Sequence, residues 1–317
     1  MCQELFTFHQ HFPHIHASLA GSPQRVSVSS LPQPPDDWPD RAFSQFLDCA
    51  GIRWHYQRQG QGPVLLLLHG TGGSTHSWAG CAAALATRYT VVSVDLPGHG
   101  FTVVPPAVER ARQVYAIDGM ARAVQQLLDA LQLQPHLAAG HSAGVPVLLR
   151  MALQRGIAPV RIVGLAPALV APPAWYVTLL APLVASVVER EVVAMSAASL
   201  AAGTRIIRAM LATTGSVLRP EQLARYEWLC RTPAHVHAAL AMMARWDLPS
   251  LLRDVTTLDT PLEVIAGRRD RWVPEAPLRR AVAGVHGASF RVEDAGHLLI
   301  EEDPARAAAW IAGAGTT

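Results

Sequence analysis

The chain has 317 residues, of which 50% are hydrophobic, and a formal net charge of +2. This length allows one domain with a large core and an inserted segment. A charge so close to zero gives no concentrated basic face, so we expect no nucleic acid among its partners. The chain contains no lysine, which excludes a Schiff base and the lysine of a phosphate-binding loop. It contains no asparagine either, which excludes N-glycosylation.

The cysteines show no CxxC motif and no paired metal-binding spacing; they are Cys2, Cys49, Cys81 and Cys230. We expect free thiols and a cytoplasmic protein. No stretch reaches the roughly 18 apolar residues that a membrane helix requires, and the nearest candidate, residues 175–188, is interrupted by Pro182. We therefore expect that the protein is not an integral membrane protein. The N-terminus also lacks the basic and apolar regions of a secretory signal.

Residues 1–37 differ in composition from the rest of the chain. They are rich in proline and serine, and they carry four histidines, His9, His11, His14 and His16. We expect a disordered N-terminal extension, since such a segment lacks the apolar residues of a core. Because little else there fixes a geometry, we expect no metal site at these histidines.

Strand and helix patterns alternate from residue 43 onward. The expected strands are a hairpin at 46–60 and apolar runs at 63–69, 89–95, 136–139, 160–169, 261–267 and 288–293. The expected helices cover residues 78–87, 119–131, 145 onward, 276–282 and 304–311. This alternation predicts an α/β fold with a mostly parallel central sheet and helices on both faces.

The strand pattern disappears between residues 170 and 252. That stretch is rich in Ala, Leu, Val, Met and Arg at helical spacing. We predict a helical lid, residues 170–252, inserted after the sixth strand. The core then consists of residues 38–169 and 253–317.

The stretch AGHSAGV places Ser142 between a buried strand and a helix. The pattern G-x-S-x-G in this setting is a nucleophile elbow. Its tight turn strains the serine backbone and presents the hydroxyl at the tip of the strand. The helix that follows directs its positive end towards that oxygen. We predict that Ser142 is a nucleophile.

A serine hydroxyl needs a general base, which a carboxylate orients. In the chain order Ser, Asp, His, Asp270 in AGRRDRWVP and His297 in EDAGHLLIEEDP each follow a predicted strand. Carboxyl ends of parallel strands meet at one edge of the sheet. We therefore predict that His297 takes the Ser142 proton and that Asp270 fixes the tautomer of His297.

Structural alternatives exist for each of these residues. Asp270 lies among three arginines and could be a surface ion-pair partner, and His297 could be a structural loop residue. His141 adjoins the nucleophile but points the wrong way for a base, so we interpret it as a residue of packing or polarity. The weaker rivals for the orienting carboxylate are Asp254, Asp259 and Asp294, none of which follows the expected strand end.

An oxyanion intermediate requires backbone N–H donors. We predict one donor at Ala143, directly after the nucleophile, and the other at Thr71 in the glycine-rich segment HGTGGS. His69 and Gly70 are expected to shape that turn. The segment DLPGHG, residues 95–100, is interpreted as a structural loop.

Together these segments resemble the α/β-hydrolase superfamily over residues 43–313, because HGTGGS, DLPGHG, GHSAG, GRRDRWVP and AGHLLIEEDP match its landmarks in order. A narrower resemblance, to the BchO family, rests on DWPDRAFSQF, DLPGHGFT, GMARAV, TGSVLRPEQLARYEWL and MMARWDL. This family is described as magnesium-chelatase accessory proteins of bacteriochlorophyll biosynthesis. It begins near DDWPDR, so residues 1–31 are either an extension or a mis-assigned start.

The resemblance implies a pathway without supplying a reaction. The apolar lid segments favour a large hydrophobic substrate, such as a tetrapyrrole ester, although a lid is also apolar where it packs on the core. Our first hypothesis is a serine hydrolase, with the magnesium chelatase as a partner. The alternatives are a non-catalytic tetrapyrrole- or chelatase-binding protein, and a cofactor-free haloperoxidase-like or lyase activity on the same triad. We expect no cofactor and no metal.

Overall fold

A computed structural model describes residues 31–171 and 204–313 of the chain. The described elements belong to one compact unit, Pro34–Thr317. The histidines of the N-terminal segment and residues 175–188 lie outside the described residues, so their predicted properties stay predictions.

One sheet of eight strands forms the centre of the described part, in the order β1-β2-β4-β3-β5-β6-β7-β8. Only the first two strands run antiparallel to their neighbours. The strands are β1 (Ser44–Cys49), β2 (Ile52–Gln59), β3 (Val64–Leu68), β4 (Thr90–Val94), β5 (Leu137–His141), β6 (Ile162–Leu165), β7 (Leu262–Gly267) and β8 (Ser289–Glu293). The predicted hairpin and mostly parallel sheet are confirmed.

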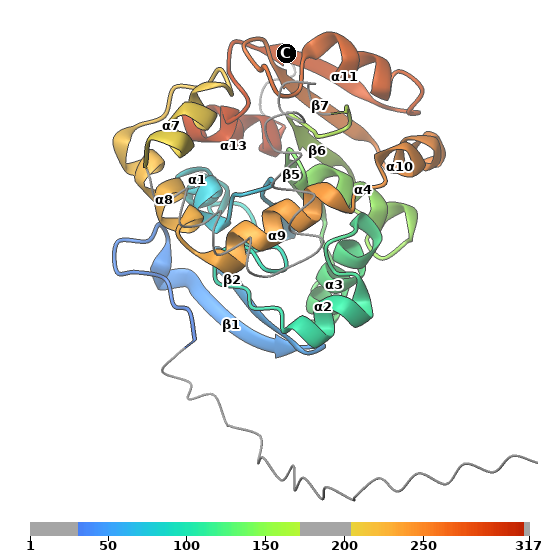
Figure 1. Ribbon diagram of the computed structural model, residues 1–317. Coiled ribbons are helices and arrows are strands. Elements are labelled where there is room, and N and C mark those ends of the chain that lie inside the picture. Colours follow the sequence, from blue (N-terminus) through green and yellow to red (C-terminus); the bar gives the residue numbers. More distant parts are fainter. Residues whose placement is uncertain (1–30, 172–203, 314–317) are drawn as a thin grey trace, which may run out of the picture. The chain divides into compact units, whose positions relative to one another are not determined.

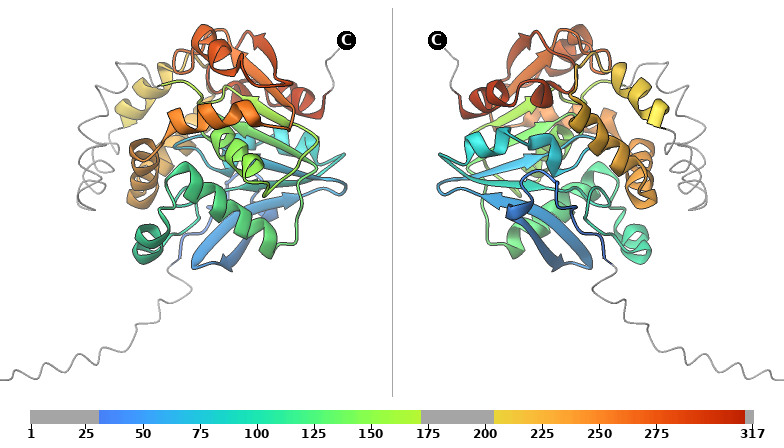
Figure 2. Two further views of the ribbon diagram at one scale, coloured as in Figure 1. Left: turned by 90° about the vertical axis from the view of Figure 1, so that its right-hand side faces the viewer. Right: turned by 90° about the vertical axis from the view of Figure 1, so that its left-hand side faces the viewer.

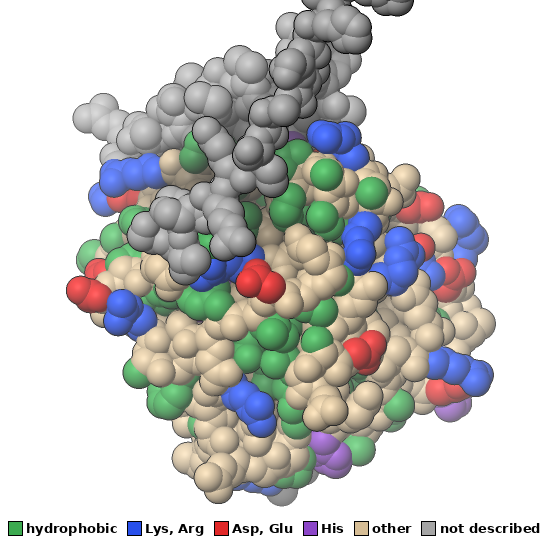
Figure 3. Space-filling view, turned by 90° about the horizontal axis from the view of Figure 1, so that it is seen from below, with side chains coloured by type: hydrophobic (Ala, Val, Ile, Leu, Met, Phe, Trp, Pro, Cys, Tyr) green, Lys and Arg blue, Asp and Glu red, His purple; other side chains and the backbone are tan. Residues whose placement is uncertain are grey.

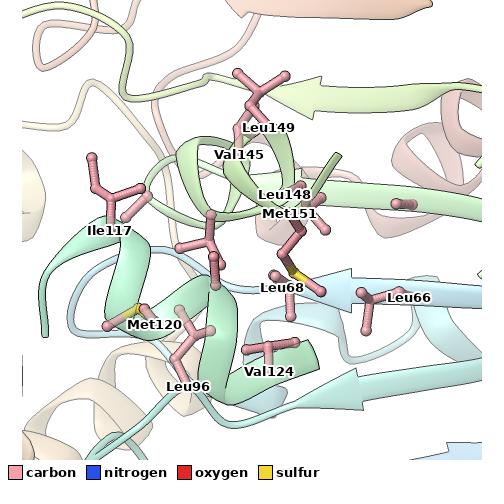
Figure 4. Packing of buried hydrophobic residues seen from close by; sticks show 14 of the residues in the cluster. Leu66, Leu68, Leu96, Ile117, Met120, Val124, Val145, Leu148, Leu149 and Met151 are labelled. Atoms are coloured by element: carbon pink, nitrogen blue, oxygen red, sulfur yellow. The ribbon is translucent and has the colours of Figure 1, made fainter. Parts of the chain in front are cut away.

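Alternating side chains of the central strands enter two separate cores. Leu66 and Leu68 of β3 pack with helices α3 (Ile117–Ala130), α4 (Gly144–Leu153) and α11 (Glu275–Val282) on one face. Figure 4 shows Leu66 and Leu68 beside side chains of α3 and α4. Leu65 and Leu67 pack with α1 (Cys81–Leu85) and α13 (Pro304–Ala312) on the other face. A strand buried on both faces explains why this run is continuously apolar.

The helix expected over residues 78–87 is broken in the structure. A 3-10 helix, η3 (Thr75–Trp78), comes first, and α1 begins only after Gly80. The backbone of Gly80 has φ +77°, and a Cβ there would lie 3.2 Å from Pro304 of α13. A left-handed backbone favours glycine and ends a helix, so the chain turns at this point.

The described residues between β6 and β7 form helices joined by loops and contain no strand. This confirms a helical insertion after the sixth strand. They are α7 (Thr204–Ala212), α8 (Pro220–Cys230), α9 (Pro233–Ala244), α10 (Leu248–Asp254) and the 3-10 helix η4 (Val255–Thr257). Figure 1 shows α8 and α9 in front of the sheet, and Figure 2 shows the yellow and orange helices gathered beside one end of the strands. The limits 170 and 252 of the lid stay predictions. The remaining short helices are η2 (Arg41–Phe43), α2 (Pro106–Arg112) and α12 (Leu299–Glu302).

The described surface and helices bear on two further expectations. On the face seen in Figure 3, arginine side chains alternate with acidic ones and form no continuous basic stripe. No helix within residues 31–171 and 204–313 has the length and apolarity that a bilayer span requires. Cys49, Cys81 and Cys230 are free thiols.

Candidate active site

Ser142 occupies a strained turn between β5 and α4. Its φ is +48°, a left-handed value that side chains other than glycine rarely adopt. A Cβ on Gly140 would lie 2.8 Å from the Val145 nitrogen, and one on Gly144 would lie 2.2 Å from the Leu68 oxygen. Both flanking glycines are therefore required by backbone packing. The geometry is that of the predicted nucleophile elbow.

A hydrogen-bonded chain joins Ser142, His297 and Asp270. The His297 Nε2 lies 3.0 Å from the Ser142 Oγ, and its Nδ1 lies 2.8 Å from the Asp270 Oδ2. All three residues are buried. Because the carboxylate accepts from Nδ1, the neutral ring presents Nε2 as the acceptor for the serine proton. The structure thus brings together the three residues that the sequence singles out.

Backbone groups orient the carboxylate of Asp270. Its Oδ1 accepts hydrogen bonds from the backbone N–H of Trp272 at 2.8 Å and of Val273 at 2.9 Å. The neighbouring Arg269 points elsewhere and pairs with Asp294 at 3.2 Å and Glu302 at 2.7 Å. The surface ion-pair alternative for Asp270 does not match this geometry.

The glycine-rich loop after β3 lies directly against the serine. A Cβ on Gly70 would be 2.9 Å from the Ser142 Cβ, so this close approach needs glycine. The next residue is Thr71, and Ala143 follows the serine at the start of α4. Within the described residues, no hydrogen bond occupies the backbone N–H of Thr71 or Ala143. Both N–H groups are thus free to donate, and their role as oxyanion donors stays a prediction.

Ser142 and His297 open into a cavity of about 450 Å³. This volume falls within the range of small-molecule sites. Most of the described lining side chains are apolar. Those from the predicted lid include Ile207, Met210, Met243, Trp246 and Leu248, and Trp272 lines the cavity from the core. Met243 and Trp246 belong to the segment MMARWDL of the predicted lid.

Comparison with known proteins assigns the family. Residues 65–310 match the model of the alpha/beta hydrolase family. The chain belongs to the alpha/beta hydrolase family. The match confirms the wider of the two resemblances seen in the sequence.

Individual relatives agree with this family. The chain is 33% identical over 274 residues to the magnesium-chelatase 30 kDa subunit of Rhodobacter capsulatus, covering 84% of this chain and 92% of that protein. This match confirms the narrower resemblance. The chain is also 31% identical over 231 residues to the pimeloyl-[acyl-carrier protein] methyl ester esterase of Aeromonas hydrophila, covering 70% of this chain and 83% of that protein. An alpha/beta hydrolase fold protein from Burkholderia ambifaria has the same fold, with a TM-score of 0.69, 24% identity and coverage of 85% and 97%.

No pattern in the sequence indicates the second polar group that adjoins this cavity. Ser77 and Tyr226 line the cavity, and the Tyr226 hydroxyl donates a hydrogen bond to the buried Glu301. Burial raises the pKa of Glu301 to about 7, although Tyr226 and Ser77 counteract part of this effect. Burial also raises the pKa of Tyr226, to well above its usual value. Gln222 and Tyr226, four residues apart on α8, both contact Glu301.

Asp95, which directly follows β4, forms the centre of another buried network. Its carboxylate accepts hydrogen bonds from His55 Nδ1 at 2.7 Å and from the backbone N–H of Thr75 at 2.6 Å and Phe101 at 2.9 Å. Burial alone would raise the pKa of Asp95, but His55 and the other donors lower it to about 2. His55 also contacts Ser44 at 3.0 Å. None of these residues lines the described cavity, so the network holds β2, β4 and η3 together.

The described residues contain no group of three His, Cys, Asp or Glu side chains that could hold a metal ion. His69, His76 and His99 lie near one another but are buried, and burial lowers the pKa of each. Several of their nitrogens bond to backbone groups: His69 Nδ1 contacts the Gly70 carbonyl at 2.8 Å. Their contacts fit the structural role expected for the two loops.

Proposed function

We propose that the protein is a serine hydrolase that cleaves an ester of a large hydrophobic substrate, with Ser142 as nucleophile. The observation that carries the proposal is the hydrogen-bonded chain from Ser142 through His297 to Asp270, of which Ser142 and His297 line an apolar cavity. Fold membership alone would not suffice, since one fold hosts many functions. The site geometry supplies the chemistry.

The reaction follows from these contacts. The Ser142 Oγ attacks the ester carbonyl carbon while His297 Nε2 removes its proton. The carbonyl oxygen becomes an oxyanion, which the backbone N–H groups of Thr71 and Ala143 stabilise. The intermediate collapses as the C–O bond breaks, and His297 returns the proton to the leaving alcohol. Water then repeats the sequence on the acyl-enzyme, which releases the acid and restores Ser142.

Asp270 supports both steps without touching the substrate. It holds the His297 ring in the tautomer that leaves Nε2 free, and its negative charge stabilises the imidazolium that forms. The two backbone N–H groups on Asp270 keep the carboxylate in position.

We further propose a tetrapyrrole ester as the substrate class and a role in bacteriochlorophyll biosynthesis, in the cytoplasm. The apolar lining favours a large hydrophobic acyl group. The relative from Rhodobacter capsulatus is named as a magnesium-chelatase subunit, and the relative from Aeromonas hydrophila as a methyl ester esterase. Together these names support methyl esters as the first compounds to test.

Hydrolysis of a panel of methyl esters, with a magnesium-porphyrin methyl ester among them, tests the proposal. The wild-type protein is expected to release methanol from at least one apolar member, and Ser142→Ala is expected to release none. Ser44→Ala is the matched control, because Ser44 also contacts a histidine that bonds to an aspartate but lies outside the cavity. Activity that survives Ser142→Ala, or is lost equally in Ser44→Ala, contradicts the proposal.

A second candidate function is a non-catalytic accessory role with the magnesium chelatase. The name of the Rhodobacter capsulatus relative is the observation that favours it. The two functions separate in a reconstituted magnesium-insertion assay with the chelatase. Stimulation by the folded Ser142→Ala variant as strong as that by the wild type would support the accessory role, whereas stimulation that requires Ser142 would support hydrolysis.

A further inference from the structure

Helix α9 of the predicted lid contacts the loop that carries the predicted oxyanion donor Thr71. His235, Ala238 and Met242 share one face of α9, because they are three and four residues apart, and all three are buried. The Met242 Sδ accepts a hydrogen bond from the Thr71 hydroxyl at 3.5 Å. A Cβ on Gly98 would lie 2.6 Å from the Ala238 Cβ. This face of α9 therefore packs on the two loops that follow β3 and β4.

The imidazole ring of His235 joins the same two loops. Its Nδ1 accepts a hydrogen bond from the backbone N–H of Gly100 at 3.0 Å, so the neutral ring carries its proton on Nε2. The Nε2 donates a hydrogen bond to the Gly72 carbonyl at 3.2 Å. Burial lowers the pKa of His235 to about 4. The ring is therefore neutral near pH 7 and keeps this tautomer.

Gly72 depends on this contact because little else in the described part of the chain restrains it. Its φ is +71°, and a Cβ at this position would meet no atom within 4 Å. Glycine has wide backbone freedom. The Gly73 N–H donates to the Gly70 carbonyl at 3.0 Å and closes the turn without touching Gly72. Among the described residues, the hydrogen bond from His235 is the one that Gly72 makes.

A second histidine holds the other end of the same turn. The His69 Nε2 accepts a backbone N–H at 2.9 Å, and its Nδ1 donates to the Gly70 carbonyl at 2.8 Å. His69 directly follows β3 in the core, whereas His235 belongs to α9. The turn is thus held from the core at Gly70 and from the predicted lid at Gly72, with Thr71 between these two points.

We propose that His235 is a positioning residue for ester hydrolysis, because its hydrogen bond to Gly72 holds the backbone N–H of Thr71 in the direction of the oxyanion. His235 is outside the lining of the described cavity, so it acts through the turn and not on the substrate. The lid then contributes to the chemical step as well as to the apolar lining. The inference rests on the proposed function, since it uses the donor role of Thr71 in that reaction.

The contact is expected to matter more in the transition state than in the bound ester. The oxyanion forms only when Ser142 attacks, so a displaced Thr71 N–H weakens the transition state and leaves ester binding almost unchanged. Removal of a whole oxyanion donor costs about 100- to 1000-fold in kcat. His235→Ala displaces the donor without removing it, so we expect kcat to fall about 10- to 100-fold while KM stays within about twofold.

Inhibition by an alkyl trifluoromethyl ketone, together with steady-state kinetics on a methyl ester, tests the inference. The Ser142 Oγ adds to the ketone carbonyl carbon and passes its proton to His297, so the ketone oxygen becomes an oxyanion. In His235→Ala, the Ki of this ketone should rise by the factor by which kcat falls. His237→Ala is the matched control, because His237 lies on the same helix but contacts Glu109 of α2 at 3.1 Å. It should keep both values.

Two conservative variants separate positioning from a purely structural role. His235→Gln places an amide N–H near the position of Nε2, where it can donate to Gly72, and should recover most of the loss in kcat and Ki. His235→Asn places an amide oxygen near the position of Nδ1, where it can accept from Gly100. It does not reach Gly72 and should stay impaired. Chemical denaturation shows which variants are folded.

Unchanged kcat and Ki in folded His235→Ala protein, or an equally large loss in His237→Ala, would overturn the inference. If His235→Ala does not fold, equal kcat and Ki in His235→Gln and His235→Asn would overturn it. Failure of the proposed function has a different signature, since the wild-type protein itself would then hydrolyse no ester and bind no ketone.

Discussion

The Nε2 of His141 lies 2.8 Å from the backbone carbonyl oxygen of His297. A carbonyl only accepts, so His141 is the donor and carries its proton on Nε2. Burial, and then the neighbouring His297, lower the pKa of His141 to about 3. The ring therefore stays neutral at physiological pH. His141 immediately precedes Ser142, so this hydrogen bond ties the end of β5 to the loop that carries the base.

His141→Leu is expected to lower kcat for ester hydrolysis by about 10- to 100-fold with little change in KM. The reason is that a displaced His297 is less well aligned with the Ser142 Oγ, and small misplacements cost about this much. His141→Gln, whose amide can donate to the same carbonyl, should recover part of the loss. Steady-state kinetics of ester hydrolysis give kcat and KM for both variants. An unchanged kcat in folded His141→Leu protein would show that the hydrogen bond does not position the base.

Asp270→Asn is expected to lower kcat by about 10⁴-fold while the protein stays folded. The amide no longer holds the His297 ring in the tautomer that leaves Nε2 free, and it does not stabilise the imidazolium. Asp294→Asn is the control, because Asp294 pairs with Arg269 at the surface. The rates of ester hydrolysis should differ by orders of magnitude between the two variants; similar rates would remove Asp270 from the proposed triad.

Gly144→Ala is expected to destabilise the protein by more than about 3 kcal/mol or to prevent folding. The new Cβ would lie 2.2 Å from the Leu68 backbone oxygen, and that contact has no flexible group to move. Gly284→Ala is the control, since its Cβ would lie 3.7 Å from a Thr256 methyl group, an ordinary contact. Chemical denaturation compares the two. A Gly144→Ala protein as stable as Gly284→Ala would contradict the packing of the elbow.

Glu301→Gln is expected to change how stability depends on pH. Burial raises the pKa of Glu301 from 4.5 to about 7, so between these values the native state holds a proton that the unfolded chain has released. That stabilisation is complete below pH 4.5 and is lost as the pH rises through 7. Glutamine has no such proton. The free energy of unfolding of Glu301→Gln, relative to wild type, should therefore rise by about 2–3 kcal/mol from pH 5 to pH 8.

Denaturation curves of both proteins at a series of pH values measure this difference. Tyr226 and Ser77 face Glu301 from α8 and η3, and Arg219 and Arg225 act on it from a greater distance. These neighbours are the same in both proteins. Parallel pH profiles would mean that the Glu301 carboxyl titrates near its ordinary value.

Local patterns were sufficient to predict the sheet and the three residues of the hydrogen-bonded chain. The elbow needs glycines at fixed offsets from Ser142, and Asp270 and His297 each follow an apolar strand, so adjacent residues carry the signal. The helix break at Gly80 was missed because it depends on Pro304, far along the chain. Tyr226 and Glu301 were missed for the same reason: they are 75 residues apart in sequence, and nothing near either one indicates the other.

Covalent labelling with a fluorophosphonate probe, mapped by peptide mass spectrometry, tests the central claim most directly. The probe reacts with a serine whose hydroxyl a base has activated, and it needs no knowledge of the substrate. The account predicts labelling of Ser142 in the wild-type protein and its loss in folded His297→Ala protein. Absence of label in folded wild-type protein, or labelling of Ser142 that persists without His297, would contradict it.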